Sequence, residues 1–192
     1  MSNELNEERL NQILLRITSK DFLEGRSLSG EIAFYIFDYP AEAELRVRRH
    51  IELLLEHIPK HKPNLRVANI NLFDFVLDHL RERNLLEKTI ELQKTRGDDF
   101  VLRHLEKILH PEKLAPLLTN KIRPLEKDLV LIHGVGSVWP MMRTHTLLSN
   151  LHPLMGKTPL VMFYPGEYNG QLLRLFGRIK SDNYYRAFRL IP

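Results

Sequence analysis

Helical stripes of apolar residues alternate along this chain with short, almost continuously apolar runs. A stripe from Leu10 to Ile17 predicts an N-terminal helix over residues 5–18, and a second stripe from Val47 to Ile58 predicts a helix after the first strand. Apolar or alternating runs predict five strands, at residues 31–38, 65–72, 128–132, 158–164 and about 185–190. A regular succession of strands and helices is typical of an α/β fold.

The middle of the chain interrupts this alternation. From about residue 85 to residue 118 the pattern is helical throughout, which predicts a helical insert between the first two strands and the last three. The chain has 192 residues, enough for one domain with a substantial core, so we expect residues 1–192 to form a single α/β domain. The alternation predicts a three-layer fold with a mainly parallel sheet of about five strands.

Composition excludes some classes of protein. The chain has no cysteine, which excludes disulfides and thiolate chemistry. The polar, acidic N-terminus does not read as a signal peptide, and no apolar run approaches the roughly 20 residues of a membrane span. We therefore expect a cytoplasmic protein without membrane contact. The net charge of +4 permits contact with nucleic acid without requiring it.

The succession of strands is similar to the layout of a P-loop ATPase, but the nucleotide motifs are missing. The turn after the first strand, from Tyr39 to Glu44, has no glycine and carries acidic residues that would repel phosphate. The segment from His133 to Ser137, where catalytic acids would stand, has two glycines but no following lysine. The sequence thus predicts a P-loop-ATPase-like layout that lacks the nucleotide motifs, and no cofactor.

Candidate catalytic side chains lack the sequence context that their chemistry requires. Ser137 is not part of a Gly-x-Ser-x-Gly elbow, and its position predicts an N-cap for a helix that begins at Trp139. Glu167 lies in a glycine-flanked loop, a good place for a functional acid, although a role in the turn or in partner binding is favoured over acid–base catalysis. We therefore assign no catalytic residue.

The nine histidines do not predict a metal site. His57 and His61 are four residues apart, but Pro59 lies between them and is expected to break the helix that would align them. No third ligand stands at a suitable spacing from other histidine pairs.

Two groups of side chains are candidates for binding. The loops after the third and fourth strands would lie side by side if those strands are neighbours, and interfaces favour aromatic residues. The candidates for partner binding are His133, Gly134, Gly136, Trp139, Tyr164, Glu167 and Tyr168. The weaker candidates for nucleic-acid contact are Arg46, Arg48, Arg49, Arg174, Arg178 and Lys180.

The segment from Val130 to Pro140 resembles the BrxB family of bacteriophage-exclusion (BREX) systems. Four further blocks add to the resemblance, at residues 37–41, 143–145, 160–168 and 184–188. The resemblance implies a small cytoplasmic component of an anti-phage defence operon. Such operons also encode a large ATPase, an adenine methyltransferase and an alkaline-phosphatase-like protein called PglZ. The family has no established catalytic residues, so none is transferred to this chain.

The leading hypothesis is a non-catalytic assembly component that binds PglZ, the BREX ATPase, or both, with the methyltransferase as a further partner and DNA contacted only indirectly. One alternative is a DNA-binding accessory subunit of the same system, acting through the Arg46–Arg49 segment or the C-terminal tail. Another is a cryptic hydrolase or nuclease that uses His133, Ser137 and Glu167. The sequence leaves the contacted subunit, the stoichiometry and the oligomeric state open.

Overall fold

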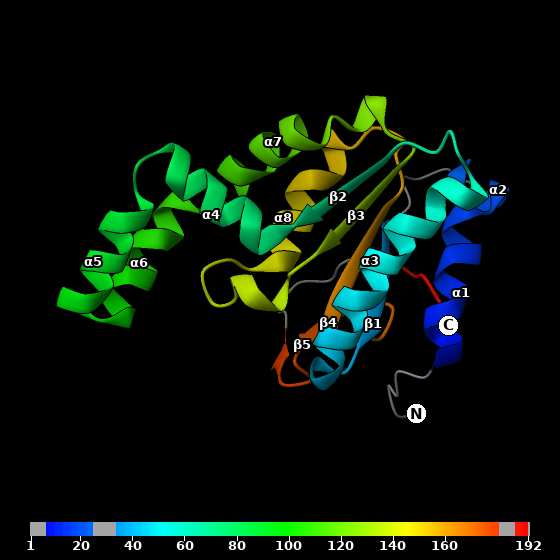
Figure 1. Cartoon of the computed structure of the whole chain (residues 1–192). Coiled ribbons are helices and arrows are strands. Elements are labelled where there is room, and N and C mark those ends of the chain that lie inside the picture. Colours follow the sequence, from blue (N-terminus) through cyan, green and yellow to red (C-terminus); the bar gives the residue numbers. More distant parts are fainter. Residues whose placement is uncertain (1–6, 25–33, 181–186, 192) are drawn as a thin grey trace.

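The computed structural model describes residues 7–24, 34–180 and 187–191, and places helices on both faces of one sheet (Figure 1). This is the α/β architecture that the sequence predicts. Among the described residues, no helix is both long enough and apolar enough to cross a membrane. That the whole chain is a single domain stays a prediction.

Five strands run parallel in the order β2-β3-β4-β1-β7, and each coincides with a predicted run. Predicted residues 31–33, 185 and 186 lie outside the described residues. The strands are β1 (Phe34–Tyr39), β2 (Val67–Asn71), β3 (Leu129–His133), β4 (Leu160–Tyr168) and β7 (Phe188–Arg189).

The sheet as a whole is mixed, so the prediction of a mainly parallel sheet of about five strands is wrong. Strand β4 continues past Tyr164 to Tyr168, and its last residues pair antiparallel with β5 (Leu173–Leu175). Strand β5 pairs in turn with β6 (Ile179–Lys180), which makes seven strands among the described residues. Strands of three and two residues are too short to give a readable alternation, which is why the sequence did not reveal them.

Alternate side chains of the central strands belong to two separate hydrophobic cores, one on each face of the sheet. On one face, Phe37, Leu131 and Phe163 pack against α1 (Glu7–Thr18), α2 (Lys20–Leu23) and α3 (Glu44–His61). On the other face, Ile132 and Met162 pack against α4 (Leu72–Glu82), α7 (Pro111–Ile122) and α8 (Thr144–Leu151). Strands covered on both faces need apolar residues at every position, which explains the continuous apolar runs.

The predicted helical insert is confirmed as helices α5 (Leu86–Arg96), α6 (Asp98–Ile108) and α7. Helices α5 and α6 form a hairpin that projects away from the sheet, whereas α7 lies over it (Figure 1). Helix α5 has no buried residue, and α6 buries only Val101 and Leu105. This hairpin, residues 86–108, is called the helical arm below.

Two local predictions are wrong, both at prolines. The helix expected to begin at Trp139 begins at Thr144, because Trp139 precedes Pro140 and takes an extended conformation (φ −73°, ψ 138°). The short 3₁₀ helices η1 (Ala41–Ala43), η2 (Pro124–Glu126), η3 (Gly136–Val138) and η4 (His152–Leu154) occupy turns. Helix α3 runs through Pro59 to His61, so Pro59 does not break this helix as the sequence predicted.

Candidate functional site

The carboxyl ends of the central parallel strands meet at one edge of the sheet. Strand β1 ends at Tyr39 opposite Pro165 of β4, and His133 at the end of β3 lies opposite Asn71 of β2. Strands β3 and β4 are neighbours, which meets the condition set for their ends to lie side by side. Only β3 ends here in a loop, however: the segment from Tyr164 to Tyr168, which includes Glu167 and was expected to be a loop, continues strand β4. Open α/β sheets usually bind their ligands at this edge.

His133 is the most unusual side chain at this edge. Its imidazole nitrogens are buried, and neither has a hydrogen-bond partner among the described residues. Burial lowers the pKa of His133 below its ordinary value of 6.5; the Glu44 carboxylate opposes this shift and the Arg48 guanidinium reinforces it. The imidazole is therefore neutral at pH 7. It borders a hollow of about 260 Å³ shared with Asn71 and Asp74.

Ser137 belongs to a chain of hydrogen bonds that links β1, α3 and the loop after β3. The Tyr39 hydroxyl donates to Glu44 Oε2 at 2.7 Å, and Arg48 Nε donates to Glu44 Oε1 at 2.7 Å. Arg48 Nη2 then donates to the Ser137 hydroxyl at 3.0 Å. Burial and the adjacent Glu44 raise the pKa of Tyr39, so the phenol stays protonated and donates. Ser137 thus lies inside η3 as an acceptor, and the prediction that it is a helix N-cap is wrong.

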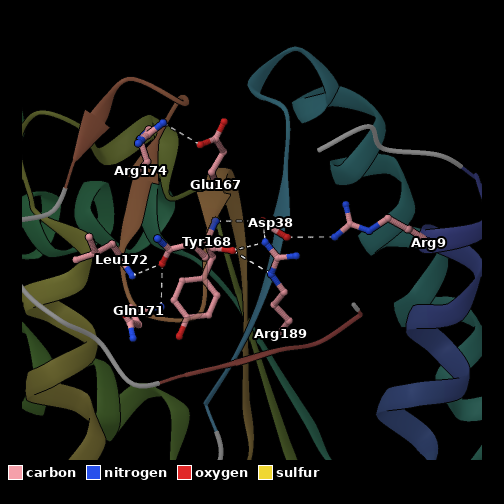
Figure 2. Close-up of polar contacts among 9 residues, drawn as sticks. Arg9, Asp38, Glu167, Tyr168, Gln171, Leu172, Arg174 and Arg189 are labelled. Atoms are coloured by element: carbon pink, nitrogen blue, oxygen red, sulfur yellow. Dashed lines mark hydrogen bonds and ion pairs between the residues drawn. The ribbon is translucent and has the colours of Figure 1, made fainter. Parts of the chain in front are cut away.

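The three residues of the hydrolase alternative are held in separate contacts. Glu167 is exposed and pairs with Arg174 across the β4–β5 hairpin at 3.2 Å (Figure 2). Ser137 accepts from Arg48, and the His133 ring has no partner among the described residues. The geometry that would let a histidine activate Ser137 is therefore absent from the described part of the chain.

Gly134 and Gly136 let the loop after β3 approach its neighbours closely. Gly134 has φ +73°, and a Cβ there would lie 2.1 Å from Asn71 Oδ1. That oxygen is already engaged, because it accepts the Phe73 backbone N–H at 3.0 Å and caps α4. A Cβ on Gly136 would lie 3.0 Å from the Phe176 ring. These two candidates therefore shape the loop and have no side chain to offer a partner.

Trp139 and Tyr164 come together in a small pocket. The pocket has a volume of about 120 Å³ and lies between the loop after β3, the start of α8 and the β5–β6 hairpin. Arg143, His145 and Lys180 supply basic groups to its lining, and none of its lining residues is acidic. Trp139 is half-buried against the core, and Tyr164 is 4% exposed. Arg143 and His145 were not predicted as site residues; their position about one turn beyond Trp139 was the available signal.

Tyr168 was predicted to bind a partner, but its side chain is not available at the surface. It is fully buried, and its hydroxyl donates to the Ala187 carbonyl at 2.7 Å and accepts the Ala187 N–H at 3.0 Å. Its backbone N–H donates to Asp38 Oδ2 at 3.1 Å, and Arg189 Nε donates to its carbonyl at 3.0 Å (Figure 2). Tyr168 therefore ties the end of β4 to the C-terminal segment.

Asp38 is the centre of this tie. The carboxylate is 1% exposed and accepts Arg9 Nη2 of α1 at 3.1 Å on the oxygen that Tyr168 does not use (Figure 2). Arg189 Nη2 lies 3.7 Å from the other oxygen. One buried carboxylate thus joins α1, β1, β4 and β7.

The candidates for nucleic-acid contact fall into two groups, and several are engaged within the chain. Arg46 pairs with Glu7, Arg48 with Glu44 and Arg174 with Glu167, while Arg49 is exposed on α3. Arg178 and Lys180 lie on the β5–β6 hairpin. Tail residues Tyr184, Tyr185 and Arg186 lie outside the described residues.

Comparison with known proteins places this architecture in a family. The family model described as "BREX protein BrxB" matches residues 68–190. A BREX protein BrxB of Bacillus cereus (strain H3081.97) is 42% identical over 188 residues, which cover 96% of each chain. A BREX protein BrxB of Escherichia coli O9:H4 (strain HS) is 42% identical over 187 residues, which cover 97% of this chain and 92% of that one. No solved structure matches the fold. With a family match over most of its length and two near-full-length relatives, the chain belongs to the BrxB family of BREX proteins.

Proposed function

We propose that this protein is a non-catalytic, cytoplasmic assembly component of a BREX anti-phage defence complex. In this proposal it docks the PglZ phosphatase-like subunit, the BREX ATPase, or both, and through them reaches the methyltransferase. Family membership supports a role within the defence system, and the Trp139–Tyr164 pocket supports docking as the form of that role.

The observation that carries the docking proposal is the composition of this pocket. It offers a half-buried indole and a tyrosine ring beside three basic side chains, and its lining has no acid. Trp, Tyr and Arg are the side chains that most often dominate the energy of protein interfaces, and Trp139 and Arg143 are the pocket residues of these types that are not buried. A volume of about 120 Å³ accepts part of one large side chain, so the pocket fits an anchor residue of a partner whose flanking residues are acidic.

The layout of the strands supports a related proposal, a P-loop-ATPase-like fold that does not bind nucleotide. The first strand leads through Tyr39 into η1 and α3, and this turn presents Glu42 and Glu44 where a phosphate loop would present glycines and a lysine. Such a fold keeps the usual binding edge of an ATPase while leaving it free to receive a protein.

Co-purification from cells that express the whole operon tests the docking proposal. We expect Trp139→Ala to weaken binding of the partner by about 2 kcal/mol, or roughly 30-fold, as for a central interface residue. Arg143→Glu combined with Lys180→Glu should also reduce recovery of the partner. The matched control reverses two charges on the helical arm, Lys94→Glu with Arg103→Glu, and should bind normally. Normal recovery with both pocket variants, checked to be folded by circular dichroism, would overturn the docking proposal.

A hydrolase or nuclease is the second candidate, because the buried imidazole of His133 has no partner among the described residues. Neutral imidazoles in hollows at strand ends are suited to act as bases. His133→Gln keeps much of the volume and removes the basic nitrogen. Full phage restriction by this variant would eliminate the candidate.

A further inference from the structure

A second surface lies at the opposite, amino edge of the sheet. An open groove of about 570 Å³ is lined by the loops that lead into β2, β3 and β4 and by the last turn of α3. Each of these loops contributes one lysine: Lys62 precedes β2, Lys127 precedes β3 and Lys157 precedes β4. His61 adds a fourth basic side chain.

The lysines follow the order of the strands, which spreads their charges along a line. Strands β2, β3 and β4 are consecutive neighbours, and their paired residues lie at the starts of the strands, as in Val67 with Leu129 and Val130 with Leu160. Neighbouring strands are about 4.8 Å apart, so the three loops span on the order of 10 Å. Positive charges distributed over this length match successive phosphates of a polymer better than one phosphate group.

The acidic group in the groove is already neutralised. Asp128 receives Arg66 Nη2 at 2.8 Å and Arg66 Nε at 3.0 Å, and the Arg66 backbone N–H donates to it at 2.8 Å. In the described residues none of the three groove lysines forms an ion pair. The groove therefore carries three lysine charges that no ion pair among the described residues neutralises, and the rest of its lining includes Leu23, Pro63 and Pro159.

We propose that this groove binds the phosphate backbone of a nucleic acid without reading its sequence. The lining has no Phe, Tyr or Trp ring on which bases could stack, so the attraction comes from the basic side chains, chiefly the three lysines. The site differs from the arginines of α3 and the C-terminal tail that the sequence singled out. It also lies at the edge opposite to the Trp139–Tyr164 pocket, so that one protein joins a partner on one edge to nucleic acid on the other. The proposal is independent of the docking proposal.

Fluorescence anisotropy with labelled duplexes of two unrelated sequences tests the proposal. Between about 50 mM and about 200 mM salt, three lysine–phosphate contacts give a slope of roughly −2 to −3 for the logarithm of the affinity against the logarithm of the salt concentration. The groove variant combines Lys62→Gln, Lys127→Gln and Lys157→Gln; it should bind about tenfold or more weakly at the lower salt and lose most of the slope. The control variant removes the same charge from the helical arm through Lys88→Gln, Lys94→Gln and Arg103→Gln, and should bind like the unmodified chain.

The outcomes separate the sources of anion binding. Equal affinity for both duplexes, lost only in the groove variant, supports the proposal. Undetectable binding at about 50 mM salt would overturn it, and so would an equal loss of affinity in the groove and control variants. Displacement of the duplex by inorganic phosphate, with the ionic strength held constant, would also overturn it. Co-purification of the partner with the groove variant should be unchanged, which keeps this test distinct from the test of the docking pocket.

Discussion

Replacement of the buried carboxylate of Asp38 should cost more stability than any exposed charge on the protein. Asp38→Ala removes the acceptor for Arg9 Nη2 and for the Tyr168 backbone N–H, and takes the nearby negative charge from Arg189. Breaking a buried ion pair by deleting one partner costs about 3–5 kcal/mol. The Arg9 and Arg189 side chains are 15% and 45% exposed and can turn toward water, so the lower end, about 3 kcal/mol, is expected.

Urea unfolding followed by far-ultraviolet circular dichroism measures this cost from the transition midpoint at constant m. For a chain of this size the loss corresponds to a fall in Tm of about 6–12 °C. The matched pair is Asp38→Asn and Glu167→Gln, since each converts a carboxylate to an amide of nearly the same shape. The exposed Glu167 pair should contribute less than about 1 kcal/mol. Equal destabilisation by the two substitutions would refute the argument that burial makes Asp38 the stronger contact.

Three further predictions concern the end of β3 and the loop that follows it. Gly134→Ala should lower the free energy of unfolding in urea by about 3 kcal/mol, because the added Cβ would clash with Asn71. The control Gly156→Ala also has a positive φ, +61°, but its Cβ would make only an ordinary 3.5 Å contact, so it should lower the free energy of unfolding by about 1 kcal/mol. Equal losses in the two variants would contradict the clash with Asn71. Because burial lowers the pKa of His133 in the folded protein, the contribution of this residue to stability is fully present above about pH 6.5. That contribution is lost as the pH falls below 6.5, because the unfolded chain then binds the proton more readily than the folded protein does. The variant His133→Gln should make the loss of stability toward acidic pH shallower, and an identical pH profile would contradict this. Ser137→Ala should cost about 0.5–1.5 kcal/mol by losing the Arg48 hydrogen bond, and abolished restriction by a folded Ser137→Ala protein would argue against a purely structural hydroxyl.

Much of the fold could be predicted because burial on both faces leaves a strong signal. Strands β3 and β4 begin as continuous apolar runs, since their alternate residues fill different cores. The predicted end of α3 and the predicted start of α8 were wrong, because prolines gave only a local signal there. A proline has a local effect whose outcome depends on its distance from the end of the helix, and tertiary packing decides where that end falls.

The candidate site was predicted only in part. The proximity of Trp139 and Tyr164 was predicted only on the condition that β3 and β4 are neighbours, since the sequence leaves the strand order open, and Tyr164 lies within β4 rather than in a loop. The role of Tyr168 could not be predicted, because its partners Asp38 and Ala187 are distant in sequence. In addition, Ala187 contacts the Tyr168 hydroxyl through its backbone, which leaves no mark on the choice of side chain. The grouping of Lys62 with Lys127 and Lys157 could not be predicted, because each lysine lies in a different loop and only the strand order brings the three loops together.

The position of β1 between β4 and β7 has a consequence for the synthesis of the chain. All six of its residues are buried, yet its strand neighbours are β4, where Phe34 pairs with Leu160, and β7, where Tyr35 pairs with Phe188. A ribosome needs on the order of ten seconds to add the intervening residues, at about 5–20 residues per second. During that interval the nascent strand has no backbone partner, and its apolar side chains are a ready target for chaperones or for a neighbouring nascent chain. Slower translation of the codons between β1 and β4 should therefore lower the expression yield, because it lengthens the time for which Phe34–Tyr39 has no partner strand.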